Sequence, residues 1–125
     1  TLRAVVSLVG NAEKELKAYF EGGLREFKTP VSNMGSPFQM SVWANLRKIP
    51  YGKTISYADL SKKVNSPAAT RAVGSANGAN QLAIIVPCHR VVRSDGSLGG
   101  YGGGLWRKKW LIEHEQNCRQ QKIAI

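Results

Sequence analysis

Long apolar segments and cysteines are both scarce in this sequence. The longest apolar run, Leu82–Pro87, is much shorter than the about 20 residues that a transmembrane helix needs. The 2 cysteines, Cys88 and Cys118, cannot build a disulfide framework, and no segment has the pattern of a signal peptide. These absences argue against a membrane-spanning protein and a disulfide-rich secreted domain. They predict a protein of a reducing intracellular compartment.

Acidic residues are also few. The chain of 125 residues and 13.7 kDa has 8 Asp and Glu against 18 Lys and Arg, a net charge of +10. Residues 1–35 hold 5 basic and 4 acidic side chains, whereas residues 36–125 hold 13 and 4. This excess favours a polyanionic partner, with nucleic acid ahead of a membrane surface because no strongly apolar amphipathic helix accompanies the charge. A basic surface that serves solubility alone is the alternative.

The first part of the chain differs from the rest in pattern as well as in charge. Asn11 is expected to cap a short amphipathic helix that Gly22 and Gly23 end. Within Lys28–Gly35 the apolar periodicity is lost and turn residues accumulate, which indicates a linker. The length leaves room for one compact domain, to which the first segment is attached as a fragment.

Two capping boxes mark helix starts in the basic part. Ser36 and Gln39 predict a helix whose apolar stripe belongs to the core. The stripe consists of Phe38, Val42, Trp43, Leu46 and Ile49. Ser56 and Asp59 predict a second helix, which is expected to run to about Val64.

A third helix, Ala68–Gly78, is expected to begin at once, with Ser66 as its cap and Pro67 at its first position. Two short helices joined by a short turn are the helix-turn-helix arrangement. The second of these helices is nearly free of bulk, and Arg71 is its only charged residue. Because a glycine inside a helix costs about 1 kcal/mol relative to alanine, the small residues indicate close approach to another backbone. That backbone belongs either to a neighbouring helix or to nucleic acid.

Glycine is concentrated in one loop. Six of the chain's 13 glycines fall within Gly96–Gly104, around Tyr101. The pattern is neither G-x-G-x-x-G after a strand nor G-K-[ST], so a nucleotide phosphate loop is rejected. The loop either presses its backbone against a flat ligand near Tyr101 or is a flexible surface loop. A final helix is expected at Leu105–Cys118, before a frayed end. Its expected inward residues are Trp106, Trp110 and Leu111, and its expected outward residues are Arg107, Lys108 and Lys109.

Cys88 stands directly after a predicted buried strand, Leu82–Val86, that Pro87 ends. The thiolate is the reactive form of cysteine, and the neighbours His89 and Arg90 could lower the pKa of the thiol. Adjacent side chains of a strand point to opposite faces, so contact between Cys88 and His89 requires a bend or a bridging water. From these residues alone, an inert buried cysteine and a nucleophile both remain open.

A metal site is a rival interpretation of the same residues. His114 and Cys118 are four residues apart on a predicted helix, and Cys88 and His89 would complete four candidate ligands. Two of the four are adjacent in sequence, which makes the pattern weak evidence for a metal.

Several motifs occur together in one order. The strongest are Val86-Pro87-Cys88-His89-Arg90-Val91-Val92, Gly99-Gly100-Tyr101, Gly103-Gly104-Leu105, Trp110-Leu111 and His114-Glu115. They are preceded by Phe38-Gln39, Val42-Trp43, Ile49-Pro50-Tyr51-Gly52, Ser56-Tyr57, Ala69, Arg71-Ala72-Val73-Gly74 and Asn80. Over about residues 36–116 the chain strongly resembles the methylated-DNA–protein-cysteine methyltransferases, or O6-alkylguanine-DNA alkyltransferases.

The resemblance implies a single irreversible transfer of an alkyl group from O6 of guanine in DNA to Cys88, with O4 of thymine as a candidate second site. It implies that His89 is the base, acting through a water, and that Glu115 holds His89. Asn80 resembles the residue that bridges the helix-turn-helix to the active-site strand, and Tyr101 resembles the donor to guanine N3. Since a thioether on cysteine is not readily hydrolysed, each protein molecule is expected to react once.

The resemblance also implies that the second helix of the helix-turn-helix enters the minor groove. Arg71 is expected to fill the gap left by a flipped-out guanine, and Tyr57 is expected to crowd the 3′ phosphate. The minor groove is only about 6 Å wide, which suits small side chains. Those expected beside the DNA are Ala72, Gly74 and Ser75.

Two positions depart from the family pattern. Gly102 is expected to line the substrate pocket with Tyr101 and Val91, and it stands where some members carry a hydroxyl side chain or alanine. One hydrogen bond to the purine O6 is therefore left to the backbone, and bulkier alkyl groups should fit. Ala83 stands where some members carry proline.

The expected fold is mainly α with a short β element. It is a winged-helix-like helix-turn-helix domain preceded by a remnant of an α/β N-terminal domain. We expect the tail of that domain and the linker at residues 1–33, the catalytic and DNA-binding domain at 34–118, and a C-terminal tail at 119–125. The family's optional zinc site belongs to the missing N-terminal part, so no metal or cofactor is expected.

The expected partner is double-stranded DNA, bound by a monomer in the nucleus of a eukaryote or the cytoplasm of a bacterium, with no membrane partner. Two other functions compete with this prediction: a non-enzymatic protein that binds alkyl lesions, and a helix-turn-helix regulator. Cys88 argues against the first, and residues 1–35 supply no second recognition element for the other. A cysteine hydrolase is disfavoured because no oxyanion site or peptide-binding signature accompanies Cys88.

Overall fold

The computed structural model describes residues 2–32 and 34–123. The chain divides into two compact units, Thr1–Ser32 and Asn33–Ile125. The division falls in the segment where the apolar periodicity is lost. No helix in the described part of the chain is long and apolar enough to cross a bilayer.

The first unit is built around helix α1 (Leu2–Phe20), which ends before Gly22 at a φ of +85°. The expectation that Asn11 caps a helix is wrong, because α1 begins upstream and includes Asn11. Capping contributes only about 1 kcal/mol, and each residue added to an existing helix gains a hydrogen bond. After α1 the chain turns back, and the Glu15 carboxylate accepts the Thr29 N–H at 2.9 Å.

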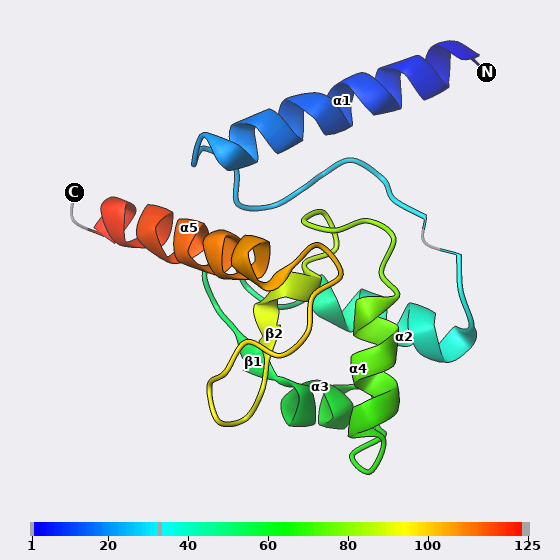
Figure 1. Ribbon diagram of the computed structural model, residues 1–125. Helices are drawn as coiled ribbons and strands as arrows, with labels where there is room; N and C mark the ends of the chain where they lie inside the picture. Colours follow the sequence, from blue (N-terminus) through cyan, green and yellow to red (C-terminus); the bar gives the residue numbers. More distant parts are fainter. Residues whose placement is uncertain (1, 33, 124–125) are drawn as a thin grey trace. The chain divides into compact units, whose positions relative to one another are not determined.

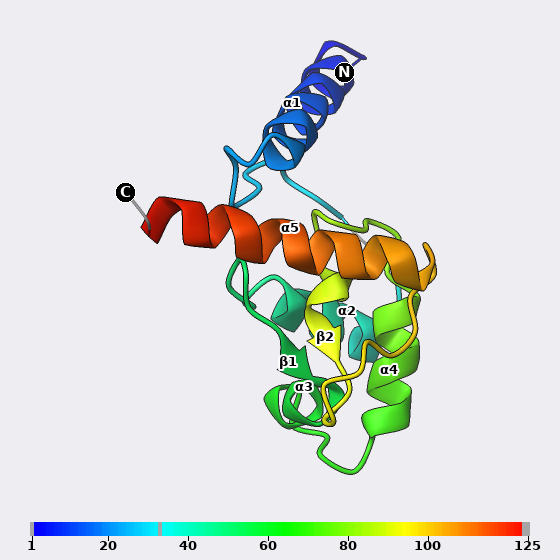
Figure 2. The same cartoon turned by 60° about the vertical axis from the view of Figure 1, so that its left-hand side comes forward.

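The second unit has the mainly α architecture with a short β element that the sequence predicts. Its elements in order are α2 (Pro37–Leu46), β1 (Ile55–Ser56), α3 (Tyr57–Lys63), α4 (Thr70–Gly78), the 3-10 helix η1 (Cys88–Arg90), β2 (Val91–Val92) and α5 (Leu105–Ile123). Helices α2, α3 and α4 pack against one another. Helix α5 packs over η1, so that β2 lies between α5 and α3 (Figures 1 and 2).

Both capping boxes are confirmed. The Gln39 N–H donates to Ser36 Oγ at 3.1 Å, and the Ser36 N–H donates to Gln39 Oε1 at 2.9 Å. The Asp59 N–H donates to Ser56 Oγ at 3.0 Å at the start of α3. Helix α2 buries Trp43, whose indole Nε1 donates to the α4 carbonyl of Ala76 at 2.8 Å. This bond ties α2 to the helix-turn-helix.

The predicted start of α4, Ala68, is wrong by two residues, and its predicted N-cap, Ser66, by three. Ser66 does not cap the helix; the N-cap is Ala69, which has no side-chain capping bond, and α4 begins at Thr70. Ser66 belongs instead to the end of α3, where its N–H donates to Ser61 O at 2.9 Å and Asn65 adopts a φ of +58°. This is a Schellman ending, which uses the backbone of Ser66 before α4 begins.

The two strands pair in parallel, Ile55 with Val91 and Ser56 with Val92. The strand predicted at residues 82–86 is wrong, because this segment forms a turn closed by an isolated bridge between Ala83 and Val86. The Val86 N–H donates to Leu82 O at 2.9 Å across that turn. An apolar run this short carries no periodicity that separates a strand from a buried turn.

The last helix also differs from its prediction. Helix α5 continues to Ile123, beyond the expected end at Cys118. Leu111 is buried as expected, but Trp106 is 69% exposed and Lys108 is completely buried. Trp110 was expected to point inward but is exposed. Lys109 is exposed, as predicted. Arg107 is exposed as predicted. The buried face of α5 therefore contains Lys108, although side-chain polarity alone predicts that a tryptophan lies there.

Candidate active site

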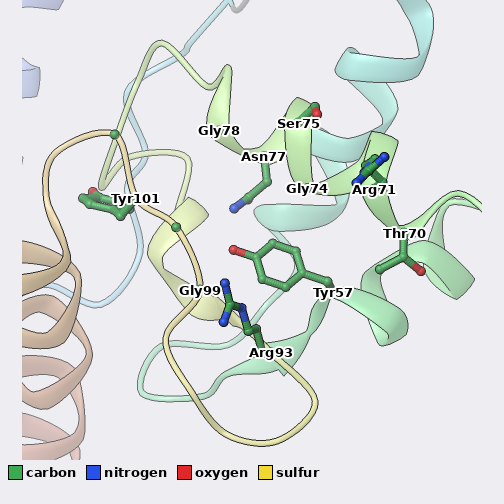
Figure 3. Close-up of a pocket in the computed structure, with 12 residues that line it drawn as sticks. Tyr57, Thr70, Arg71, Gly74, Ser75, Asn77, Gly78, Arg93, Gly99 and Tyr101 are labelled. Carbon is green, nitrogen blue, oxygen red and sulfur yellow. The ribbon is translucent and has the colours of Figure 1, made fainter.

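Cys88 lies at the start of η1, and its side chain reaches the smaller of two neighbouring cavities. This inner cavity, of about 160 Å³, is lined by Asn77, Gly78, Asn80, Ala83, Cys88, Gly100, Tyr101, Gly102 and Gly103. The outer cavity, of about 870 Å³, shares five lining residues with it, Asn77, Gly78, Gly100, Tyr101 and Gly102 (Figure 3). The outer lining adds Tyr57, Thr70, Arg71, Gly74, Ser75, Arg93 and Gly99. A buried sulfur thus lies behind a wider opening that carries two arginines.

Of the two alternatives for bringing Cys88 and His89 together, a bend after Pro87 is present, as the 3-10 helix. Successive side chains in a 3-10 helix are about a third of a turn apart, so Cys88 and His89 do not point to opposite faces as they would in a strand. Both side chains are buried. Burial raises the pKa of the Cys88 thiol, against smaller opposing effects of Asn80, Lys108 and Tyr101. The resting sulfur is therefore a thiol that needs a base.

His89, Arg90 and Glu115 form a buried cluster beside the cysteine. His89 Nε2 and Glu115 Oε2 are 2.6 Å apart, and Arg90 donates to both carboxylate oxygens at 2.8 and 3.1 Å. Arg90 also donates to Ile49 O at 2.8 Å, and the Gly52 N–H donates to Glu115 Oε1 at 3.1 Å. Burial alone would raise the pKa of Glu115, but the hydrogen bonds from His89 and Arg90 lower it to about 2. Glu115 is therefore ionised at neutral pH.

The protonation of His89 follows from this arrangement. Burial lowers the pKa of His89, so the imidazole is neutral at neutral pH. Because an ionised Glu115 accepts hydrogen bonds only, His89 donates its proton from Nε2. Nδ1 then carries the lone pair, and it is buried without a hydrogen-bond partner in the described part of the chain. Such an atom can accept a proton.

Two asparagines hold the backbone around Cys88: Asn77 within α4, and Asn80 just after the end of α4. Asn80 Nδ2 donates to Val86 O at 2.8 Å, and Asn80 Oδ1 accepts the Leu82 N–H at 3.1 Å. Asn77 Nδ2 donates to Cys88 O at 3.3 Å, while its Oδ1 is buried without a partner among the described residues. Asn77 was not among the site residues predicted from the sequence. Its spacing of three residues from Asn80, which puts both on one helical face, is the signal that could have found it.

Lys108 is the second residue of the site that was not predicted from the sequence. Its Nζ donates to Gly100 O at 3.2 Å and to Leu98 O, and it lies 3.5 Å from the Tyr57 hydroxyl. Burial lowers the pKa of Lys108 to about 8. The amine thus ties the glycine loop to α5. Its spacing of three and seven residues before Leu111 and Glu115 is the signal that could have found it.

Tyr101 projects from this loop at the junction of the two cavities (Figure 3). Burial and the neighbouring Cys88 raise the pKa of Tyr101 to about 12, so its hydroxyl stays protonated. Gly99, at a φ of +73°, has no room for a side chain, because a Cβ there would lie 2.9 Å from the Tyr57 ring. The loop is therefore packed against α3.

The remaining predicted site residues fall into two groups. Arg71 and Ser75 are exposed on α4 and line the outer cavity with Gly74, and Gly102 lines both cavities. Ala72 and Val91 line neither cavity. Ala72 is exposed on α4, whereas Val91 is completely buried in the sheet opposite Ile55.

The metal interpretation gains no geometric support. His114 Nδ1 and Cys118 Sγ are 3.8 Å apart, and the His114 ring stacks on Trp110. Over residues 2–32 and 34–123, no three His, Cys, Asp or Glu side chains gather as metal ligands. Cys88 and His89 therefore do not join the pair on α5.

Fold and site together define a helix-turn-helix domain with a buried cysteine beside a histidine–carboxylate pair. Residues 37–117 match the family model described as the DNA binding domain of 6-O-methylguanine DNA methyltransferase. The methylated-DNA–protein-cysteine methyltransferase of Mycolicibacterium paratuberculosis is 50% identical over 114 residues, which cover 91% of this chain and 69% of that protein. The chain belongs to the methylated-DNA–protein-cysteine methyltransferase family.

Solved structures give the same result. Mycobacterium tuberculosis OGT in complex with DNA is 49% identical, with a TM-score of 0.86 over 87% of this chain and 68% of that one. Schizosaccharomyces pombe Atl1, in complex with damaged DNA containing O6-carboxymethylguanine, is 30% identical, with a TM-score of 0.58 over 66% of this chain and 79% of that one.

Proposed function

We propose that this protein repairs DNA by moving an alkyl group, typically methyl, from O6 of guanine to Cys88. O4-alkylthymine is a second candidate substrate of the same chemistry. The observation that carries the proposal is the arrangement of His89, whose buried, partnerless Nδ1 is the basic end of a neutral imidazole fixed by Glu115. Family membership at 50% identity supports the same reaction.

The proposed chemistry is one nucleophilic displacement. His89 Nδ1 takes the Cys88 proton through a water, and Sγ attacks the alkyl carbon, so that a C–S bond forms as the C–O6 bond breaks. The released guanine ends with the one proton that the thiol gave up. Tyr101, still protonated at neutral pH, donates a hydrogen bond to guanine N3 as negative charge develops there. The thioether is stable, so each molecule reacts once.

The target base must leave the duplex to reach Cys88, because the sulfur lies in the inner cavity. We assign Arg71 the role of filling the gap in the stack, since it is exposed on α4 at the outer cavity. Tyr57 crowds the 3′ phosphate from α3. Helix α4 lies in the minor groove, where its small side chains fit. These side chains are Ala72, Gly74 and Ser75.

The substrate pocket is assigned to the inner cavity. Tyr101 and Gly102 line it, and Gly102 leaves the purine O6 to a backbone N–H. Asn80 keeps its assigned role, because its bonds to Leu82 and Val86 fix the end of α4 to the segment before Cys88. Val91 lies in the sheet and lines neither cavity, so it is assigned no direct contact with the substrate. We propose a monomer in the compartment that holds DNA, the bacterial cytoplasm or the eukaryotic nucleus.

Neither alternative function is favoured. A protein that only binds alkyl lesions has no need for Cys88 and the histidine–carboxylate pair beside it. A regulator needs a second recognition element, and residues 2–32 hold one helix and the chain that turns back along it.

Intact-mass analysis after incubation with duplex DNA containing O6-methylguanine tests the proposal. One methyl group per molecule should appear, located at Cys88. Cys88→Ser should abolish transfer and leave DNA binding nearly intact, because the hydroxyl is similar in size but a far weaker nucleophile. Cys118→Ser is the matched control and should react like the wild type. Methylation of Cys88→Ser at the wild-type rate would refute the nucleophile assignment.

A further inference from the structure

Arg93 is a cation of the outer cavity that the proposed repair chemistry leaves unused. It lines this cavity together with Tyr57 and Arg71, and Figure 3 shows its guanidinium beside the Tyr57 ring. The lining contains two arginines and no carboxylate. The mouth of the site is therefore positively charged on two sides of Tyr57.

The parallel sheet fixes Arg93 next to Tyr57. Ser56 pairs with Val92, so the residues that follow the two strands are Tyr57 and Arg93, at the same end of the sheet. After β2 the chain makes a tight turn in which the Arg93 N–H donates to Ser97 O at 2.9 Å. The backbone of Arg93 is thus held on both sides, whereas its side chain is exposed.

The guanidinium of Arg93 is exposed and faces no carboxylate in the lining of the outer cavity. It forms no ion pair with any residue in the described part of the chain. The charge of Arg93 helps to lower the pKa of Asp95, after the larger effect of Ser97. Asp95 Oδ1 is nevertheless engaged by Ser97, from its N–H at 2.9 Å and its Oγ at 2.7 Å. Arg93 is therefore an exposed cation on a fixed backbone, with no ion-pair partner among the described residues.

We propose that Arg93 binds a backbone phosphate of the DNA at the mouth of the outer cavity, on the side of Tyr57 away from α4. This inference rests on the proposed function, since it needs a duplex seated on α4. A guanidinium offers two parallel N–H donors to phosphate oxygens. A phosphate contact is the same for every sequence, so Arg93 raises affinity for all duplexes equally and adds to the salt dependence of binding.

A salt titration of binding to an unmodified duplex tests the contact. Arg93→Ala should reduce the log–log salt slope by about 0.9, the value for one neutralised phosphate. The affinity advantage of the wild type should then shrink about threefold when salt is raised fourfold. Arg93→Lys should keep the wild-type slope, and urea midpoints should show that both variants fold like the wild type. Equal slopes for wild type and Arg93→Ala would overturn the proposal.

Lys109→Ala is the matched control. Lys109 is an exposed lysine of α5 that lies 4.0 Å from Glu113 and lines neither cavity. Its loss removes one positive charge of the same unit without removing the proposed contact. We expect its slope to match that of the wild type. A slope change as large as that of Arg93→Ala would mean that net charge alone governs binding, against the proposal.

Single methylphosphonate substitutions along the duplex locate the phosphate. At one position the neutral group should weaken wild-type binding but add nothing to the loss in Arg93→Ala, as expected for two halves of one contact. Additive losses at every position would refute the contact. The failures are distinguishable: a wild type that gains no methyl group refutes the proposed function, whereas a wild type that reacts but shows additive losses refutes only the role of Arg93.

Discussion

The inner and outer parts of the site differ in whether their charged side chains are buried and paired. In the inner cluster of His89, Arg90 and Glu115, the carboxylate is buried and accepts hydrogen bonds from both neighbours. At the outer rim of Arg71 and Arg93, both guanidinium groups are exposed and form no ion pair with any described residue. In the inner cluster the buried charges of Arg90 and Glu115 are paired with each other, and Glu115 orients His89 as the proposed base for the thiol. The rim leaves its positive charge available, which is what the proposed binding of DNA requires.

Breaking the inner cluster should have the largest effect. Glu115→Gln leaves the Arg90 charge buried without its counterion, and loss of one partner of a buried pair costs about 3–5 kcal/mol. His89 also loses the carboxylate that orients it, so methyl transfer should slow about 100-fold or more. Urea unfolding and single-turnover methylation measure the two effects. Glu113→Gln, at an exposed pair with Lys109, should change stability by about 0.5 kcal/mol or less. Similar losses in both variants would contradict the comparison.

The pH dependence of stability sharpens the same comparison. The pKa of Glu115 is about 2 in the folded protein against an ordinary value of 4.5, so its contribution is fully present above pH 4.5. It is lost as pH falls from 4.5 towards 2. The stability difference between wild type and Glu115→Gln should therefore shrink across this window. A constant difference would mean that the carboxylate charge is not what stabilises the cluster.

Breaking the rim should affect duplex DNA more than a small substrate. Arg71→Ala should slow methyl transfer from a duplex much more than transfer from the free O6-methylguanine base, because only the duplex has a base to extrude. Unstacking costs a few kcal/mol, so a loss of about tenfold or more on the duplex is expected. Parallel single-turnover assays with the two substrates measure it. Equal slowing on both would exclude the extrusion role of Arg71.

Lys108 joins the two regions, and its removal should have the smallest effect. Lys108→Met frees the loop carbonyls of Leu98 and Gly100, so transfer should slow about tenfold as Tyr101 loses its fixed position. Lys108→Arg keeps the charge and serves as the matched control for rate. A Lys108→Met protein that reacts at the wild-type rate would show that the loop is held without the amine.

Lys108 also gives a signature in stability. Its pKa is about 8 in the folded state and 10.5 ordinarily, so between these values the unfolded chain binds more protons. The wild type should gain stability as pH rises from 8 to 10.5, and Lys108→Met should lack this gain. Urea midpoints across this range measure it.

Helix starts show which structural features can be predicted from a few neighbouring residues. Ser36 and Ser56 cap as predicted because each capping box closes between atoms three residues apart. Ser66 has only part of this signal, because the residue three positions later is Ala69, whose side chain cannot accept a hydrogen bond, and the Ser66 N–H donates to Ser61 O at the end of α3. The complete capping box therefore predicts a helix start more reliably than a serine followed by proline alone.

Burial was less predictable than helix formation. Side-chain polarity places Trp106 inward and Lys108 outward on α5, and the structure reverses both. A buried lysine is tolerated only where acceptors meet its amine. These acceptors are carbonyls of the glycine loop, whose position depends on the packing of Gly99 against Tyr57. No pattern within the helix contains that information.

The sequence by itself determined the family, the cysteine between Pro87 and His89, the basic charge and the capped helices, because these depend on residue identity and on contacts within a few residues. Only the tertiary structure decided how His89 meets Glu115, 26 residues away, and how parallel pairing brings Arg93 beside Tyr57. The physical reason is that such contacts form only when the whole core closes the intervening loops, so no local segment encodes them.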